Sequence, residues 1–183
     1  MDNKRVKDLM VPLDEYAVVS DQATLLDAVT ALEEAQKNLP PGRQPYRAVL
    51  VVGSEGKIIG KIGQLAFLNA LEPKFNVLGD LGKLAVAGVS SEFISQMTEH
   101  FRFFQDNLSD LCQRAGALHV KDVMHPVTDS IDENASLGDA INRLVALQTL
   151  SLLVQRRGEM VGLLRLSDLF DEVTREMKQQ HST

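Results

Sequence analysis

The heptapeptide that decides the fold occurs twice in this chain. Its first copy is Val6-Lys-Asp-Leu-Met-Val-Pro12, and its second copy is Val120-Lys-Asp-Val-Met-His-Pro126. The copies begin 114 residues apart and share five of their seven positions. A repeat of this kind indicates that one supersecondary unit is used twice. We therefore expect the two halves of the 183-residue chain to fold alike.

A capped helix is predicted after each copy of the heptapeptide. Thr24 is followed three positions later by Asp27, and Ser136 is followed three positions later by Asp139. Apolar residues at helical spacing come next in both halves. A hydroxyl residue with an acidic residue three positions on is a variant of the capping box, with Asp in place of the commoner Glu or Gln.

Two strands and a closing helix are predicted in the rest of each half. Residues 46–63 and 150–165 each contain two apolar runs joined by a glycine-containing turn, which is typical of paired strands. Helical stretches then follow at 64–71 and 166–177. The predicted fold class is α/β, with a strand–helix–strand–strand–helix unit used twice.

Two segments interrupt the repeat. Residues 37–45 contain prolines and a glycine and are predicted to be a loop. The connector between the halves is long, and apolar residues recur in steps of three and four from Phe93 to Ala115, which predicts an amphipathic helix that ends at Gly116. The predicted organisation is repeat 1 at residues 4–71, the connector at 72–117 and repeat 2 at 118–178.

Composition and charge exclude several classes of function. The net charge of −6 argues against a sequence-independent nucleic-acid binder, which needs a basic face for the phosphates. The apolar run at 48–52 is far too short to cross a membrane, and no export signal is visible, so we expect a cytoplasmic protein.

Catalysis and metal binding are not expected either. Cys112 is the single cysteine, and its place on the apolar face of the connector helix predicts a small core residue. The four histidines show no metal-ligand spacing, and no nucleophile–base pair is apparent.

The complete pattern resembles a tandem pair of CBS domains. The resemblance is carried by the V-K-D-x-M-x-P opening, the capped helix, the strand pair with G-x-x-x-G, and the closing GLLRLSDLF at 162–170. It covers residues 4–71 and 118–178. It implies a pseudo-twofold α/β module, often dimeric, that binds adenosine-containing ligands between the repeats and acts as a regulatory sensor rather than a catalyst.

The resemblance also implies a ligand site in the second repeat. The ribose-binding Asp of the family corresponds to Asp168, beside Ser167, whereas Arg165 stands where the family usually has a hydroxyl residue. A carboxylate can accept hydrogen bonds from two vicinal hydroxyls, and a helix N-terminus attracts phosphate. In the first repeat Gly63 and Ala66 occupy the matching positions, so one site is expected rather than two.

Pseudo-symmetry implies which residues of the first repeat complete the Asp168 site. They are the strand that begins near Ser20 and the segment Tyr46, Arg47 and Ala48. Arg165 and Arg47 would supply positive charge for phosphate, and the loop before Tyr46 would bring Arg43 near. The expected ligand is AMP, ADP or ATP, S-adenosylmethionine is possible, and no other cofactor is expected.

Alternatives remain open for each of these residues. Asp168 could simply cap its helix, Arg165 could be a surface residue in an ion pair, and Tyr46 could be a strand residue at the core edge. The module could also be a ligand-free scaffold that acts through protein–protein contacts. We further expect a homodimer with contacts from the helix around Phe93–Ala115, and a regulated protein partner whose identity the sequence does not indicate.

Overall fold

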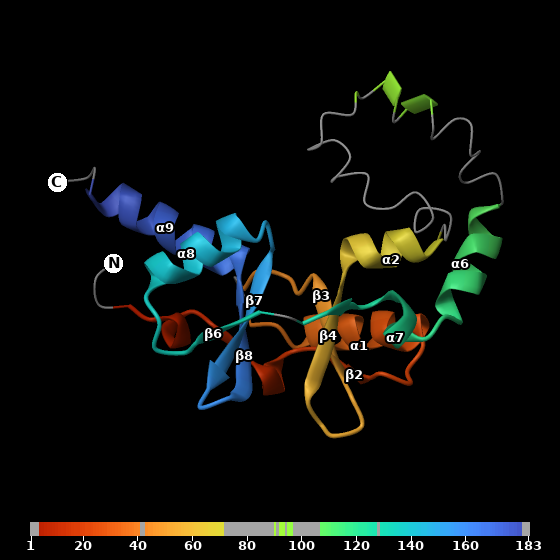
Figure 1. Ribbon diagram of the computed structural model, residues 1–183, viewed down its shortest axis with the longest axis horizontal. Helices are drawn as coiled ribbons and strands as arrows, with labels where there is room; N and C mark the ends of the chain where they lie inside the picture. The colour runs from red at the N-terminus through yellow and green to blue at the C-terminus, as the bar shows by residue number, and fades with distance from the viewer. Residues whose placement is uncertain are drawn as a thin grey trace.

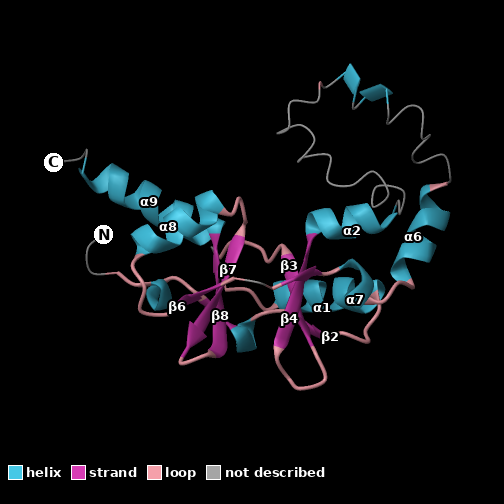
Figure 2. Cartoon of the chain, in the orientation of Figure 1, coloured by secondary structure: helices cyan, strands magenta, loops and turns pink. Residues whose placement is uncertain are grey.

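The computed structural model describes residues 4–40, 43–71, 90, 92–93, 95–96, 107–127 and 129–180. Two similar halves lie side by side along the long axis of the molecule (Figure 1). Each half contains a four-stranded sheet with helices packed against it (Figure 2). The predicted α/β class and the twofold use of one unit are confirmed.

The order of elements is the predicted one in both halves. The first half contains β2 (Val18–Ser20), α1 (Leu25–Lys37), β3 (Ala48–Val52), β4 (Ile58–Gly63) and α2 (Gln64–Leu71). The second half contains β6 (Ser130–Asp132), α8 (Leu137–Ala146), β7 (Ser151–Arg156), β8 (Glu159–Arg165) and α9 (Leu166–Gln180). The strands β2 and β3 run parallel, as do β6 and β7, because a helix connects the members of each pair.

Both predicted capping boxes are present. The Thr24 hydroxyl accepts a hydrogen bond from the Asp27 amide at 3.2 Å, and the Asp27 carboxylate accepts one from the Thr24 amide at 2.8 Å. Ser136 and Asp139 make the same two bonds at the start of α8, at 3.0 and 3.4 Å. Each reciprocal pair satisfies amide donors that a helix N-terminus would otherwise leave without partners.

The repeated heptapeptide explains how the halves are joined, because each copy pairs with the sheet of the other half. The first copy forms a 3₁₀ turn (Val6–Asp8) and β1 (Val11–Pro12), and β1 pairs with β8 of the second half. The second copy forms α7 (Val120–Val123) and β5 (His125–Pro126), and β5 pairs with β4 of the first half. The sheet orders are β2-β3-β4-β5 and β1-β8-β7-β6.

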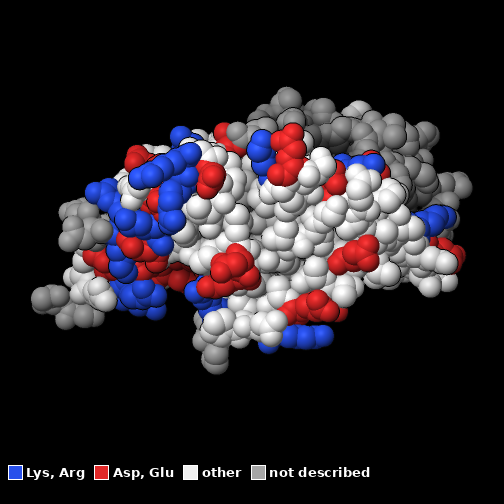
Figure 3. Space-filling view, turned by 90° about the horizontal axis from the view of Figure 1, so that it is seen from below, with Lys and Arg blue, Asp and Glu red and all other residues white. Residues whose placement is uncertain are grey.

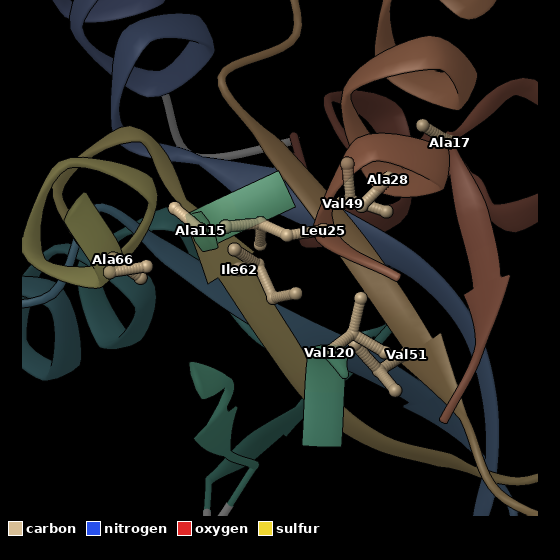
Figure 4. Packing of buried hydrophobic residues seen from close by; sticks show 10 residues of the cluster. Ala17, Leu25, Ala28, Val49, Val51, Ile62, Ala66, Ala115 and Val120 are labelled. Atoms are coloured by element: carbon tan, nitrogen blue, oxygen red, sulfur yellow. The ribbon is translucent and has the colours of Figure 1, made fainter. Parts of the chain in front are cut away.

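The first valine of each heptapeptide is also exchanged between the halves. Val120 is fully buried in the core of the first half, where Figure 4 shows it beside Val51. Val6 is fully buried in the core of the second half, packed with Ile131 and Leu137. Each exchanged segment is also fixed by a backbone hydrogen bond to the opposite half. The Val6 amide donates to the Ala135 carbonyl, and the Val120 amide donates to the Ala23 carbonyl.

Two matched glycines make the strand exchange possible. A Cβ atom on Gly162 would lie 2.8 Å from the carbonyl oxygen of Val11 and 2.9 Å from the sulfur of Met10. A Cβ atom on Gly60 would collide with the Met124 side chain in the same way. The methionine of each heptapeptide therefore lies directly over a glycine of the opposite half.

A third core lies between the two sheets. Its buried members come from both halves and are Val11, Tyr16, Tyr46, Leu50, Leu153 and Leu163. Alternate residues of a strand point to opposite faces, so Leu50 faces this central core while Val49 and Val51 face the helices of the first half. The two repeats consequently share one continuous interior.

The predicted connector helix is confirmed in its last part by α6 (Leu108–Gly116). Leu111 and Ala115 are buried, whereas Leu108 and Cys112 are exposed. The prediction that Cys112 is a core residue is wrong, because α6 buries only the narrow stripe that carries Leu111 and Ala115. Most of the predicted helix before residue 107 lies outside the described residues.

Candidate functional site

The predicted ligand residues Arg165 and Asp168 contact each other. Arg165 ends β8, and Asp168 lies in the first turn of α9. The Arg165 Nε atom donates to Asp168 Oδ2 at 2.5 Å, and Nη2 donates to Oδ1 at 2.6 Å. This bidentate pairing uses both carboxylate oxygens and is the strongest geometry available to an arginine and a carboxylate.

Arg165 also ties the second half to the loop of the first half. Its Nη1 atom donates to the carbonyl oxygens of Gln44 and Pro45, at 2.9 and 3.4 Å, and the guanidinium lies 5.4 Å from the ring centroid of Tyr46. Burial acts to lower the pKa of Arg165, but the hydrogen bonds and charge of Asp168 outweigh it and raise that pKa. The Arg165 side chain is only 6% exposed, so the expectation of a surface ion pair is wrong in its location although the ion pair exists.

Two tyrosines fill the space next to this ion pair. The rings of Tyr16 and Tyr46 lie 4.7 Å apart between their centroids, and both residues are buried. Burial raises the pKa of the Tyr16 hydroxyl far above its ordinary value, so it stays neutral. Tyr46 is thus a member of the central core rather than a residue at its edge.

The remaining predicted residues are only partly brought together. Ser167 is half-buried beside Asp168, and Ala48 is half-buried at the start of β3. Arg47 is exposed. Ser20 pairs with Val52, at the end of β3 that is farthest from Ala48, so the structure does not bring it to Asp168.

Arg43 faces a glutamate rather than this group of residues. It lies 3.5 Å from Glu15 in an ion pair whose two side chains are both exposed.

The assignment of ribose to Asp168 stays a prediction, and the ion pair of Asp168 with Arg165 limits how a ligand could bind there. A ligand diol would have to share the Asp168 carboxylate with Arg165 or displace Arg165 from it.

An open cavity lies at the position related to the Asp168 group by the pseudo-twofold. Its volume is about 340 Å³, and both repeats line it. The first repeat contributes Lys61 of β4, and the second repeat contributes the segment around β5 and the segment that leads from α8 into β7. The lining residues are Lys61, His125, Pro126, Val127, Asp129, Leu147, Gln148, Thr149, Ser151, Leu152 and Leu153.

The replacement of one large side chain explains why this cavity is open while its counterpart is filled. Val51 faces Gly60 in the first sheet and Val154 faces Gly162 in the second, so the register aligns Tyr46 with Thr149. The same register aligns Ala48 with Ser151 and Leu163 with Lys61. In the open cavity Thr149 takes the place of Tyr46, and Lys61 takes the place of the apolar Leu163.

Lys61 belongs to the first repeat, lines the cavity and is hydrogen-bonded to the second repeat. Its ammonium donates to the Thr149 hydroxyl at 3.1 Å, to the Ser151 hydroxyl at 3.0 Å and to the Ser151 carbonyl at 3.1 Å. All three acceptors are uncharged. Burial lowers the pKa of Lys61 below its ordinary value.

Comparisons with known proteins agree with this architecture. Residues 120–175 match the family model of the CBS domain. The second repeat is a CBS domain. No curated protein sequence matches the chain at a significant level. The first repeat lies outside the part that the family model matches and shares the order of elements of the second repeat.

Solved structures show the fold of a CBS pair over nearly the whole chain. CBSX2 from Arabidopsis thaliana is 17% identical with a TM-score of 0.59, and the match covers 95% of this chain and 96% of that one. A structure of CBSX2 in complex with AMP matches at 17% identity and a TM-score of 0.59, covering 94% of this chain and 98% of that one. A CBS domain-containing protein of unknown function from Bacillus anthracis is 16% identical with a TM-score of 0.60, and the match covers 94% of both chains.

Metal centres and membrane-spanning helices are two other features that could indicate a function. Within the described ranges, no cluster of three or more His, Cys, Asp or Glu side chains could hold a metal ion. In the same part of the chain no helix has the length and apolar character needed to cross a membrane. On the face shown in Figure 3, positive and negative side chains are interspersed, mostly toward the end that carries α8 and α9.

Sequence analysis missed Lys61 as a site residue. The only signal was a lysine between Ile59-Gly60 and Ile62 in an otherwise apolar strand. Alternation places Lys61 on the face opposite to the buried Ile62, which is the face directed at the other repeat. Whether that position is closed or open depends on side chains of the second repeat, about 90 residues away.

Proposed function

We propose that this CBS pair is a non-catalytic regulatory module that binds an adenosine-containing nucleotide between its two repeats. AMP, ADP and ATP are the expected ligands, and S-adenosylmethionine shares the adenosine moiety. The observation that carries the proposal is the cavity of about 340 Å³ that both repeats line. Its volume lies within the range of about 300–1,000 Å³ that is usual for small-molecule sites.

The chemistry of the cavity supports a ligand that is polar at one end and apolar at the other. Lys61, His125 and the Ser151 hydroxyl offer donors, whereas the leucines offer a surface for a flat ring. The structure of CBSX2 in complex with AMP, which shares this fold, supports an adenine nucleotide as the first ligand to test.

A thermal-shift panel with AMP, ADP, ATP and S-adenosylmethionine tests the proposal. A ligand at a hundredfold its Kd adds about 2.7 kcal/mol of stability. For a chain of this size each kcal/mol corresponds to about 2–4 °C, so we expect a rise in Tm of about 5–10 °C with at least one ligand. If all four leave Tm unchanged at millimolar concentration, the proposal is wrong.

A ligand-free scaffold is the second candidate function. The bidentate Arg165–Asp168 pair and the two buried tyrosines favour it, because they occupy the cleft that the family resemblance assigns to the ligand. In that case the module acts on its protein partner through its outer surface. A partner that binds equally well with and without nucleotide would support the scaffold over the sensor.

The proposed homodimer concerns the connector. Phe93 and Leu108, which belong to the predicted apolar stripe, are 51% and 62% exposed. Exposed apolar surface on the predicted stripe supports an interface there. Light scattering at micromolar concentration should give twice the mass of the 20.2 kDa chain. A monomeric mass would refute the dimer without affecting the nucleotide proposal.

A further inference from the structure

We propose that the Lys61 cavity binds the anionic part of a small organic phosphate, and that the charge of Lys61 selects phosphorylated over unphosphorylated ligands. This inference rests on the proposed function and specifies its ligand class and position. It places the phosphate on the side of the CBS pair that lacks the family's carboxylate, where Gly63 and Ala66 stand.

The first argument is the charge of Lys61. Lys61 is half-buried, and the three hydrogen bonds of its ammonium all go to uncharged oxygen atoms of Thr149 and Ser151. Burial of a cation among neutral groups disfavours the charged form, which is why the pKa of Lys61 is lowered. An anion in the cavity would restore the stabilisation that Lys61 loses by leaving water.

A contrast with Arg165 strengthens this argument. Arg165 is the buried cation of the opposite side, and the Asp168 carboxylate already balances its charge. The position that matches Lys61 in the second half is Leu163, which is fully buried. On the Lys61 side an incoming phosphate therefore meets a cation that is hydrogen-bonded to uncharged oxygens. On the Arg165 side it meets a cation that is already paired with a carboxylate.

The second argument is the supply of further donors. The Ser151 hydroxyl accepts its hydrogen bond from Lys61, so its own hydrogen can be donated to a phosphate oxygen. The ring of His125 lines the same cavity and is exposed, so a ring N–H can reach a ligand. The Thr149 hydroxyl, in contrast, already donates to the Ser151 carbonyl at 3.2 Å.

Asp129 sets the orientation of such a ligand. It also lines the cavity, and its carboxylate would repel a phosphate but can accept hydrogen bonds from hydroxyl groups. A ligand with its phosphate toward Lys61 and its hydroxyls toward Asp129 brings opposite charges together and keeps the phosphate away from the carboxylate. Nucleoside monophosphates and sugar phosphates have this combination, whereas simple anions and unphosphorylated nucleosides have only half of it.

Calorimetry on the full chain, as the wild type and as four variants, tests the inference. Lys61→Met removes the charge and keeps most of the side-chain volume, and Lys61→Arg keeps the charge. Lys57→Met is the matched control, because it makes the same change in net charge. The Lys57 side chain is 78% exposed, on the turn between β3 and β4. The probes are AMP, adenosine and pyrophosphate.

We expect AMP to bind the wild type at least tenfold more tightly than adenosine does. Lys61→Met should weaken AMP about ten- to hundredfold, which is the loss expected for a charge-assisted hydrogen bond, and should leave adenosine within about twofold. Lys57→Met should leave both affinities unchanged, and Lys61→Arg should recover part of the AMP affinity. Asp168→Ala tests the alternative position of the ligand, at the residue to which the family resemblance assigns the ribose.

Three results would overturn the inference in distinguishable ways. Equal affinities for AMP and adenosine, or AMP binding that depends on Asp168 and not on Lys61, would refute the Lys61 site while the proposed function stands. Binding of pyrophosphate that requires Lys61, with no binding of AMP or adenosine, would refute the nucleotide function while the anion site stands. No binding of any probe would refute both.

Discussion

Removing the Asp168 carboxylate should destabilise the fold, because it leaves the Arg165 guanidinium buried without its counter-ion. The two side chains are 6% and 18% exposed and share two hydrogen bonds. Breaking a buried ion pair from one side costs about 3–5 kcal/mol, and the partial exposure of Asp168 reduces this to about 2–4 kcal/mol. With an m-value of about 2 kcal/mol/M, the urea midpoint of Asp168→Ala should fall by about 1–2 M.

Two further variants make the test specific to the ion pair. Asp171→Ala removes an exposed carboxylate from the same helix and should shift the midpoint by no more than about 0.3 M. Replacing both partners, with Arg165→Met and Asp168→Leu together, should restore much of the stability that Asp168→Ala loses, because no buried charge remains. The reasoning is refuted if Asp168→Ala resembles Asp171→Ala, or if the double variant is less stable than Asp168→Ala.

Further predictions concern the segments exchanged between the halves and the ion pair between Lys4 and Glu172. Gly162→Ala should lose about 1–3 kcal/mol in urea unfolding, because its Cβ would meet the backbone of β1, whereas Gly63→Ala, with no atom within 4 Å of the added Cβ, should lose under about 0.5 kcal/mol. Val120→Ala should cost about 2 kcal/mol and speed hydrogen exchange in α1 and β3 more than in α8 and β7, and uniform acceleration would contradict the exchanged packing. The hydrogen bond from Lys4 lowers the pKa of Glu172, so its stabilisation is present above the ordinary glutamate pKa and is lost as the pH falls. Glu172→Gln should therefore be less stable than the wild type at pH 7 and should show a shallower loss of stability below about pH 4.5, and parallel pH profiles would show that this carboxylate contributes nothing.

Local features of the fold could be predicted from the sequence because their physical causes are local. The capping boxes at Thr24 and Ser136 need only residues three positions apart, and alternation of apolar residues is enough to indicate β3 and β7. The exchange of β1 and β5 could not be predicted in this way. Pairing of Pro12 with Gly162 joins residues 150 positions apart, and the local pattern does not show which sheet a short strand enters.

The candidate site likewise has a part that could be predicted from local sequence and a part that could not. The i,i+3 spacing of Arg165 and Asp168 made their proximity predictable, but whether the guanidinium faces a ligand or the carboxylate depends on the carbonyls of Gln44 and Pro45. The prominence of Lys61 depends on Thr149 being smaller than Tyr46 at the matching place, and on Ser151 having a hydroxyl that Ala48 lacks. Such a property belongs to two distant segments together and leaves no motif in either one.

The central claim is that a nucleotide binds between the two repeats, and an NMR titration of the ¹⁵N-labelled chain with AMP tests it most directly. We predict saturable shifts that fit one site per chain, concentrated on the amides of Lys61 in the first repeat and of His125 and 148–153 in the second. A titration to millimolar AMP that moves no amide, or that moves only amides on the outer helices, would contradict the claim.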